Sequence, residues 1–322
     1  MPRSFTAEEN KPGPVPLLIG LMGAPGSGKT YSALTLADGM RADGLGKPVL
    51  IDTERGRSRK YRTAFDFARI DLTPPFRPTD FLSAVHGALK SKPCAVIIDS
   101  LSDEHEGEGG VLDWHDAEVP GAGGNEWAAW KKPKDDRRVM INGFLQIITP
   151  LILCFRAREK TKQLPEGRNG KMIPVNIGYM PIAPMEIIHA IDVNIVLPPK
   201  SDGRPQWRSD KVGEDFVIKL PQQFKSLFGS GQPLTREIGG KLAAWACGQE
   251  TVVKTDDSAV INAARLACQD GRVAWGQFWH GASQQEKEAI RPHIAELEKI
   301  LKANEIDDDP MAGRFADDRS AA

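Results

Sequence analysis

Short runs of apolar residues recur along the first half of the chain, and a charged residue follows each run but the first. They cover residues 15–22, 48–51, 94–98 and 150–155. Continuous apolar runs of this length are typical of parallel strands that are buried on both faces of a sheet. Two stretches between them, 31–40 and 80–91, carry apolar residues at helical spacing. This alternation predicts an α/β fold with a mainly parallel sheet flanked by helices.

The first apolar run leads into a glycine-rich loop. Its residues are Gly23, Ala24, Pro25, Gly26, Ser27, Gly28, Lys29 and Thr30, which fit the phosphate-binding pattern G-x-x-x-x-G-K-[ST]. In such a loop the backbone N–H groups point at nucleotide phosphates, the lysine neutralises them, and the threonine hydroxyl holds Mg²⁺. Strand, loop and helix follow one another in the order that the motif requires. The sequence therefore predicts a site for ATP and Mg²⁺.

Acidic residues follow the second and third apolar runs. Glu54 lies three residues after the second run, and Asp99 directly follows the third. Both are expected at the carboxyl edge of the sheet, where open α/β folds bind their ligands. Asp99 matches the aspartate that supports Mg²⁺ in nucleotide hydrolases. Ser100 occupies the next position, where many P-loop ATPases carry the catalytic glutamate, so Glu54 becomes the candidate base that activates water. The alternative for Glu54 is a salt bridge with the arginines that follow it.

Basic residues gather in two places. The first cluster, Arg55, Arg57, Arg59, Lys60 and Arg62, either faces solvent or contacts an anionic substrate or a neighbouring subunit. The second begins at Arg156, which follows the fourth apolar run and is a candidate sensor of the γ-phosphate. Residues 156–171 are basic and contain glycine, so we expect a mobile loop that binds nucleic acid. Its candidate contacts are Arg158, Lys160, Lys162, Arg168 and Lys171.

A long glycine-rich segment, 101–138, separates the third and fourth predicted strands, and it reads as an irregular loop. Trp114, Trp127 and Trp130 lie in it, and lysines follow at 131, 132 and 134. These aromatic and basic residues either stack the bases of a single strand or pin the loop to the body of the protein. The acidic run 103–106 predicts no metal site, because consecutive residues do not easily converge on one ion.

The remaining chain divides into further expected segments. Residues 187–197 read as a strand, 206–212 as its hairpin partner carrying Arg208 and Lys211, and 241–247 as a short helix. The predicted organisation is a flexible N-terminus (1–14), an α/β core (15–248), a polar linker (249–257), a helical hairpin (258–304) and a disordered acidic tail (305–322).

Composition narrows the classes of protein and partner. The 322 residues are 40% hydrophobic, which suffices for a core, and the net charge of -1 means that a nucleic-acid partner needs a local basic patch. No apolar stretch reaches the length of a membrane span and the N-terminus is polar, so we expect a cytoplasmic protein without membrane contact. The scattered cysteines, Cys94, Cys154, Cys247 and Cys268, predict neither a zinc site nor a disulfide framework.

The order of these parts resembles the RecA-like ATPases, in particular the compact AAA-domain P-loop proteins encoded by bacteriophages. The resemblance is carried by residues 23–30, 49–54, 96–101 and 151–160. It implies that Glu54 activates water, that Asp99 supports Mg²⁺, and that Arg156 senses the γ-phosphate, although RecA has a glutamine at that last position. It also implies a homo-oligomer in which Arg208 or Lys211 reaches the nucleotide of a neighbouring subunit.

The resulting functional hypothesis is an ATPase, stimulated by single-stranded DNA, that acts in phage recombination, annealing or replication with phage or host proteins. Two alternatives remain. One is a nucleotide-gated partner or loader protein that docks through its C-terminal helices. The other is a P-loop kinase of small molecules.

Overall fold

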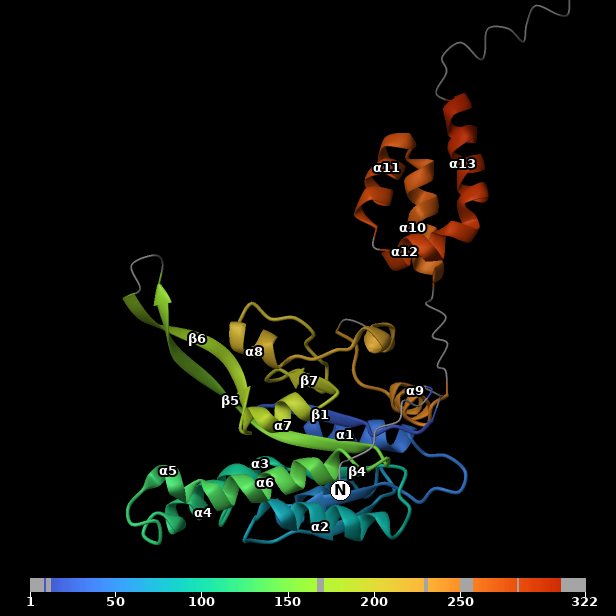
Figure 1. Ribbon diagram of the computed structural model, residues 1–322. Coiled ribbons are helices and arrows are strands. Elements are labelled where there is room, and N and C mark those ends of the chain that lie inside the picture. Colours follow the sequence, from blue (N-terminus) through green and yellow to red (C-terminus); the bar gives the residue numbers. More distant parts are fainter. Residues whose placement is uncertain are drawn as a thin grey trace, which may run out of the picture. The chain divides into compact units, whose positions relative to one another are not determined.

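The computed structural model describes residues 9, 13–166, 171–228, 231–249, 257–282 and 284–307 (Figure 1). The chain forms two compact units, Met1–Thr251 and Val252–Ala322, called here the larger and the smaller unit. None of the helices in these described ranges has both the length and the apolar composition needed to cross a membrane.

A mainly parallel seven-stranded sheet organises the larger unit, which confirms the predicted α/β fold. The strands are β1 (Leu18–Gly23), β2 (Val49–Asp52), β3 (Ala68–Asp71), β4 (Val96–Asp99), β5 (Leu151–Glu166), β6 (Lys171–Pro181) and β7 (Val193–Leu197). Their order is β3-β2-β4-β5-β1-β7, and β6 pairs antiparallel with β5. The four apolar runs became β1, β2, β4 and the start of β5. The short strand β3 was not predicted, because charged residues interrupt its apolar pattern.

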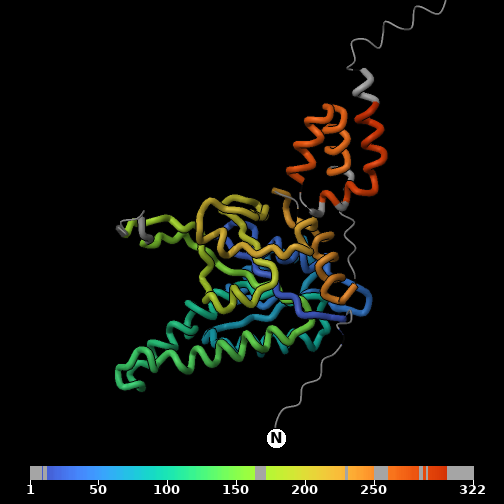
Figure 2. Tube along the Cα trace, turned by 45° about the horizontal axis from the view of Figure 1, so that its top comes forward, coloured from blue at the N-terminus to red at the C-terminus, as the bar shows by residue number. Residues whose placement is uncertain are grey.

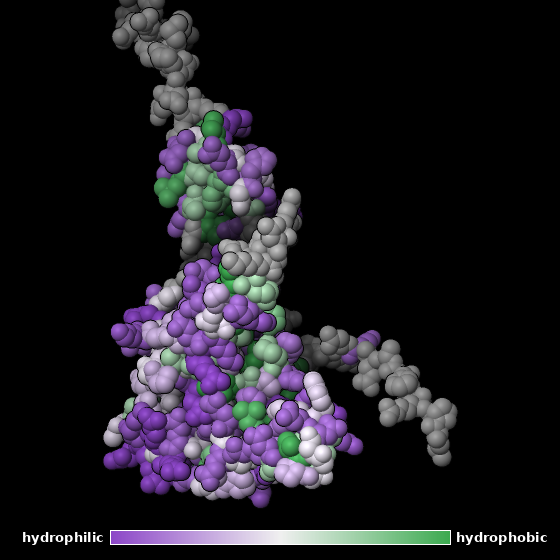
Figure 3. Space-filling view, turned by 90° about the vertical axis from the view of Figure 1, so that its left-hand side faces the viewer, coloured by the Kyte–Doolittle hydropathy of each residue, from purple (hydrophilic) through white to green (hydrophobic). Residues whose placement is uncertain are grey.

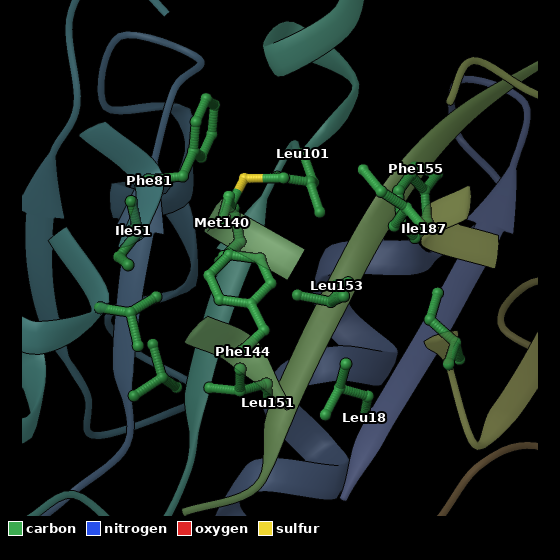
Figure 4. Packing of buried hydrophobic residues seen from close by; sticks show 14 of the residues in the cluster. Leu18, Ile51, Phe81, Leu101, Met140, Phe144, Leu151, Leu153, Phe155 and Ile187 are labelled. Atoms are coloured by element: carbon green, nitrogen blue, oxygen red, sulfur yellow. The ribbon is translucent and has the colours of Figure 1, made fainter. Parts of the chain in front are cut away.

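Helices cover both faces of the sheet. In Figure 1, α1 (Lys29–Gly39) lies on one face, while α2 (Pro78–Leu89) and α6 (Lys131–Phe144) lie on the other. Phe81 of α2 and Phe144 of α6 pack over Ile51 and Leu153 of the sheet, and all four side chains are buried (Figure 4). Each fully buried side chain of this size contributes about 1.5–3 kcal/mol relative to exposure. This layer therefore fixes the strands whose ends carry the candidate site.

Helix α9 (Arg236–Ala246) packs against α1 with almost nothing between the two backbones. A Cβ atom added to Gly39 would lie 1.9 Å from the carbonyl oxygen of Arg236. One added to Gly239 would lie 2.1 Å from the carbonyl oxygen of Leu36. Glycine is therefore required on both helices for this close approach.

Segment 101–138 is helical, so the prediction of an irregular loop was wrong. It contains α3 (Ser102–Glu106), α4 (Val111–Glu118), α5 (Glu126–Ala129) and the first half of α6. The side chain of Asn125 caps α5 by accepting the N–H of Ala128. Buried Arg137 of α6 pairs with buried Glu104 of α3, with Nε and Oε1 2.7 Å apart. These contacts stabilise helices in a segment whose glycine content suggested a loop.

Three further predictions about secondary structure need correction. The basic segment 156–171 is part of a long hairpin, because β5 continues to Glu166 and returns as β6. Segment 187–197 begins as helix α7 (Met185–Ala190), and only its end is strand β7. Segment 206–212 meets β7 through a single bridge between Val196 and Gln206, so it is no hairpin strand; α8 (Val212–Val217) follows it.

The smaller unit is a cluster of short helices, whereas a two-helix hairpin was predicted. Its elements are α10 (Asp257–Gln269), α11 (Arg272–Gly281), α12 (Gln284–Ile290), the 3₁₀ turn η3 (Arg291–His293) and α13 (Ile294–Asp307). Gly271, at φ 93°, ends the first helix and Pro292 interrupts the second, which explains the extra elements. Cys268, Ile290 and Leu297 are buried in its core. Most of the predicted N-terminus, linker and acidic tail lies outside the described residues.

Candidate functional site

The parallel register gathers four predicted site residues at one edge of the sheet. Gly23, at the end of β1, pairs with Arg156 of β5. Two residues before Arg156, Cys154 pairs with Asp99 of β4, and Asp99 pairs with Asp52 of β2. The glycine-rich loop, Asp99, Glu54 and Arg156 therefore lie together at the carboxyl edge, as we expected from the sequence.

The glycine-rich loop is closely packed. Gly28, at φ 94°, precedes the first residue of α1, and a Cβ atom there would lie 2.8 Å from the backbone nitrogen of Gly203. Gly203 donates its N–H to the carbonyl oxygen of Ser27 at 3.1 Å. The hydroxyl of Ser27 is buried and has no hydrogen-bond partner within the described part of the chain. A buried hydroxyl without a partner suits a loop in which a bound phosphate group accepts the missing hydrogen bond.

Lys29 lies at the start of α1 and folds over its own loop. Its Nζ donates to the carbonyl oxygens of Gly23 and Ala24, at 3.0 and 2.9 Å. Burial lowers the pKa of Lys29, and the nearby carboxylates of Asp99 and Glu54 oppose this effect. The lysine is thus a partly desolvated cation, which strengthens its attraction for a phosphate.

Thr30 and Asp99 form the pair that would hold a magnesium ion. The Thr30 hydroxyl donates to Oδ2 of Asp99 at 2.6 Å. Burial raises the pKa of Asp99 to about 6, the hydrogen bond from Thr30 lowers it, and the charge of Glu54 raises it further. The hydroxyl of Thr30 and the buried carboxylate of Asp99 are the hard oxygen donors that Mg²⁺ prefers, so the residues present fit this ion.

Glu54 lines a small pocket together with Thr30 and Asp99. Its Oε2 also lies 3.0 Å from Nη1 of Arg57, in the 3₁₀ turn η1 (Arg57–Tyr61). Both interpretations of Glu54 from the sequence thus describe part of the structure, because the side chain faces the pocket and carries an arginine partner.

Sequence analysis did not predict Tyr61 as a site residue, and it predicted Lys60 only within a basic cluster that faces solvent or contacts an anionic substrate or a neighbouring subunit. Both residues line the same pocket. Nζ of Lys60 lies 4.9 Å from the ring centroid of Tyr61, and the ring of Tyr31 is 6.3 Å from that of Tyr61. An aromatic side chain beside a phosphate site is suited to stack on a nucleotide base. The only signal in the sequence was an aromatic residue shortly after Glu54.

Arg156 lies at the edge of the site but is held by acidic residues of α3. Its Nη2 lies 2.7 Å from Oδ1 of Asp103 and 3.4 Å from Oε1 of Glu106. Asp103 also accepts the hydroxyl of Thr53, the residue before Glu54. The predicted phosphate sensor is therefore linked to the loop that carries the candidate base. No cluster of His, Cys, Asp and Glu side chains suited to a metal ion is found in the described residues.

The β5–β6 hairpin carries the predicted nucleic-acid contacts and projects from the body of the larger unit (Figure 2). Arg158 and Lys160 are two residues apart, so they share one face of β5, and a register shift follows Lys160. Arg158, Lys160 and Lys162 are all exposed. Figure 3 looks onto this side of the larger unit, where hydrophilic residues dominate the surface. Arg168 lies outside the described residues, and Lys171 begins β6.

Arg208 and Lys211 do not line the pocket formed by Thr30, Glu54 and Asp99. They lie between the bridge at Gln206 and helix α8, in a segment held by buried Glu214, which accepts the Ser209 hydroxyl at 2.6 Å. Arg208 is exposed.

The three tryptophans of segment 101–138 differ in their surroundings. Trp114 donates its indole N–H to Glu118 and lies under Arg77, and Trp130 stacks on His115 with ring centroids 4.1 Å apart. Trp127 of α5 is 88% exposed. The interpretation that the tryptophans pin this segment thus describes Trp114 and Trp130, whereas Trp127 is available to a ligand.

Comparisons with known proteins cover the part of the chain that carries the site. A family profile described as AAA domain matches residues 16–181. Among solved structures, the chain is similar to a KaiC-like protein from the hyperthermophilic archaeon Pyrococcus horikoshii, at 14% identity with a TM-score of 0.26. That similarity covers 53% of this chain and 91% of that one. No curated protein matches the chain. The profile match spans the glycine-rich loop, Glu54, Asp99, Arg156 and the whole β5–β6 hairpin.

Proposed function

Since this chain belongs to the AAA domain family, we propose that it binds ATP with Mg²⁺ and hydrolyses the bond to the γ-phosphate. The observation that carries the proposal is the convergence of Lys29, Thr30, Glu54 and Asp99 at one edge of the sheet. Each of these groups has a part in phosphoryl transfer that suits its chemistry.

In the proposed reaction, water attacks the γ-phosphorus while the bond to the bridging oxygen breaks, and ADP and phosphate leave. The Glu54 carboxylate orients the water and accepts its proton. The Lys29 ammonium and the backbone N–H groups of the loop attract the phosphate oxygens, on which charge is redistributed in the transition state. Thr30 and Asp99 would hold Mg²⁺, which supplies further charge neutralisation when bound.

Arg156 has a second role in this proposal. Its backbone lies beside Gly23, the first residue of the glycine-rich loop, while its guanidinium pairs with Asp103 and Glu106. A γ-phosphate competes with these carboxylates for the same cation, so nucleotide binding changes the contacts at the base of the β5–β6 hairpin. This supports Arg156 as a sensor that links the nucleotide to the hairpin.

We further propose that the hairpin binds single-stranded DNA. Arg158, Lys160 and Lys162 give the hairpin a basic surface, and its β5 strand continues ten residues past Arg156, or roughly 33 Å at about 3.3 Å per residue. Exposed Trp127 offers an additional stacking surface. The resemblance to RecA-like phage proteins supports a role in recombination, annealing or replication, as a homo-oligomer in which Arg208 or Lys211 reaches a neighbour's nucleotide.

The smaller unit supports one alternative. It is a separate compact unit that exposes Leu266 and Val273, which suits the docking of a protein partner. In that case the chain is a nucleotide-gated loader, and it binds the nucleotide through the same residues as the proposed ATPase.

The test is the ATPase rate with and without single-stranded DNA, at roughly 50 and 200 mM salt. Stimulation by DNA should fade as salt rises, because binding to phosphates releases counterions. Replacing both Lys160 and Lys162 by alanine should abolish the stimulation and leave the basal rate unchanged. The matched control replaces Lys90 and Lys225, two exposed lysines elsewhere in the larger unit.

Each other outcome points to a different function. A basal rate that DNA does not change favours the loader, and a rate that rises only with a small phosphate acceptor favours a kinase. An absence of nucleotide binding would contradict the proposal as a whole.

A further inference from the structure

Asp52, the last residue of β2, is a carboxylate with no role assigned above. It is 2% exposed and directly precedes the loop that carries Glu54. Oδ1 of Asp52 accepts the backbone N–H of Glu54 at 2.8 Å and that of Gly56 at 3.2 Å. Oδ2 accepts both the backbone N–H of Ser58, at 3.1 Å, and the Ser58 hydroxyl.

These four donors use the acceptor capacity of the side chain. A carboxylate has two oxygens with about four lone-pair positions, and four N–H or O–H donors point at those of Asp52. Little capacity remains for a metal ion or a water molecule. Asp52 and Glu54 both line the pocket, but the hydrogen bonds of the Asp52 carboxylate are directed at its own loop.

The loop needs such an anchor because its backbone is unfavourable by itself. Arg55 has φ 54° and Gly56 has φ 83°, so two successive residues occupy the left-handed region. This conformation is uncommon for an arginine and persists where surrounding contacts hold it. The N–H groups on both sides of this kink donate to Asp52, which fixes the direction in which Glu54 leaves the end of the strand.

Arg69 is a cation near Asp52, and its contact is weaker than those of the four donors. Its Nη1 lies 3.7 Å from Oδ2 of Asp52, beyond hydrogen-bond distance, and the guanidinium bonds instead to Asp71. An ion pair with Arg69 thus does not account for the four ordered donors around Asp52.

We infer that Asp52 is a positioning residue, which holds loop 53–58 so that the Glu54 carboxylate faces the nucleotide site. The inference rests on the proposed ATPase function for its catalytic part. Its structural part, the ordering of the loop by Asp52, stands independently of any activity.

The experiment compares Asp52→Asn with the wild-type chain. Asparagine keeps the shape but offers one oxygen acceptor, and its NH₂ group faces donors. We expect kcat for ATP hydrolysis to fall about 10- to 100-fold, as for small misplacements of reacting groups, while KM for ATP stays within about threefold because Lys29 and Thr30 are untouched. Amide hydrogen exchange of Glu54, Gly56 and Ser58 should become at least about tenfold faster.

The matched control is Asp71→Asn. Asp71 lies beside Asp52 in the sheet register and also contacts Arg69, but it accepts no N–H of the loop. It should leave kcat and the exchange of residues 54–58 unchanged. Ser58→Ala removes one of the four hydrogen bonds, so its effect should have the same direction and be smaller, which provides a mild variant should Asp52→Asn fold poorly.

Two results would overturn the inference. If Asp52→Asn or Ser58→Ala leaves the exchange of residues 54–58 as in the wild-type chain, Asp52 does not hold the loop. If exchange rises while kcat stays unchanged, the loop does not position the base. A wild-type chain without ATP turnover would instead contradict the proposed function and the catalytic part of the inference, and the exchange measurement would still decide the structural part.

Discussion

At the scale of single residues, Glu54 and Lys29 are expected to respond differently to substitution. Glu54→Gln should preserve ATP binding and lower turnover about 10²- to 10⁴-fold, because the amide cannot accept the proton of water. Lys29→Ala should weaken ATP binding itself, because the loop loses its partly buried cation. Equilibrium binding of a fluorescent ATP analogue and a steady-state ATPase assay separate the two effects. Turnover that survives Glu54→Gln would remove Glu54 as the base.

Asp99 makes stability depend on pH. Burial raises its pKa from 3.8 to about 6, so in this range the folded chain holds a proton that the unfolded chain has released. Its stabilising contribution is therefore complete below about pH 4 and is lost as the pH rises through about 6. Urea unfolding of the wild type and of Asp99→Asn should show a difference in free energy of unfolding that falls across this range. A difference in unfolding free energy that does not change with pH would contradict the raised pKa of Asp99.

At the scale of elements, the pair between Glu104 and Arg137 joins α3 to α6. Both side chains are buried, so Arg137→Ala leaves an unpaired carboxylate and should cost about 3–5 kcal/mol of unfolding free energy. The neighbouring Arg138 provides a control, because its pair with Asp135 is exposed and Arg138→Ala should cost less than about 1 kcal/mol. Denaturant unfolding compares the two variants, and equal costs would exclude the buried pair as the link.

The elements also show which patterns sequence analysis could use. Strands β1, β2, β4 and the start of β5 were predicted because each is a continuous apolar run that local sequence reveals. Helices α3 to α6 were not predicted, because their packing depends on the contact between Glu104 and Arg137, which lie 33 positions apart. The β5–β6 hairpin was missed because basic residues and glycines in an exposed strand resemble those of a loop.

The candidate site was predictable to a similar extent. The glycine-rich loop is a contiguous motif, and Glu54, Asp99 and Arg156 are marked by their positions after apolar runs. Asp52 also follows a strand, but its role depends on the fold of the next six residues, where Arg55 and Gly56 take a left-handed conformation. Tyr61 lines the pocket because it ends the 3₁₀ turn η1, and no periodic pattern of apolar residues predicted that turn.

At the scale of the whole molecule, the division into two units predicts independent folding. A chain that ends at Thr251 should bind ATP with the affinity of the full chain and keep its basal ATPase rate within about twofold. The reason is that every residue lining the proposed nucleotide site lies in the larger unit. Isothermal titration and an ATPase assay on the truncated chain provide the measurement. A loss of nucleotide binding would show that the larger unit depends on the smaller one.

The glycine contact between α1 and α9 limits how far this sequence can diverge. At Gly39 and Gly239 the atoms in the way of a side chain belong to the opposing main chain, so no second substitution elsewhere can make room. A substitution of Lys29 removes a functional group and leaves the packing of the two backbones unchanged. A substitution of either glycine instead separates α1, the helix that begins at the glycine-rich loop, from α9. In a random library selected only for folding, these two glycines should be retained while the catalytic residues drift.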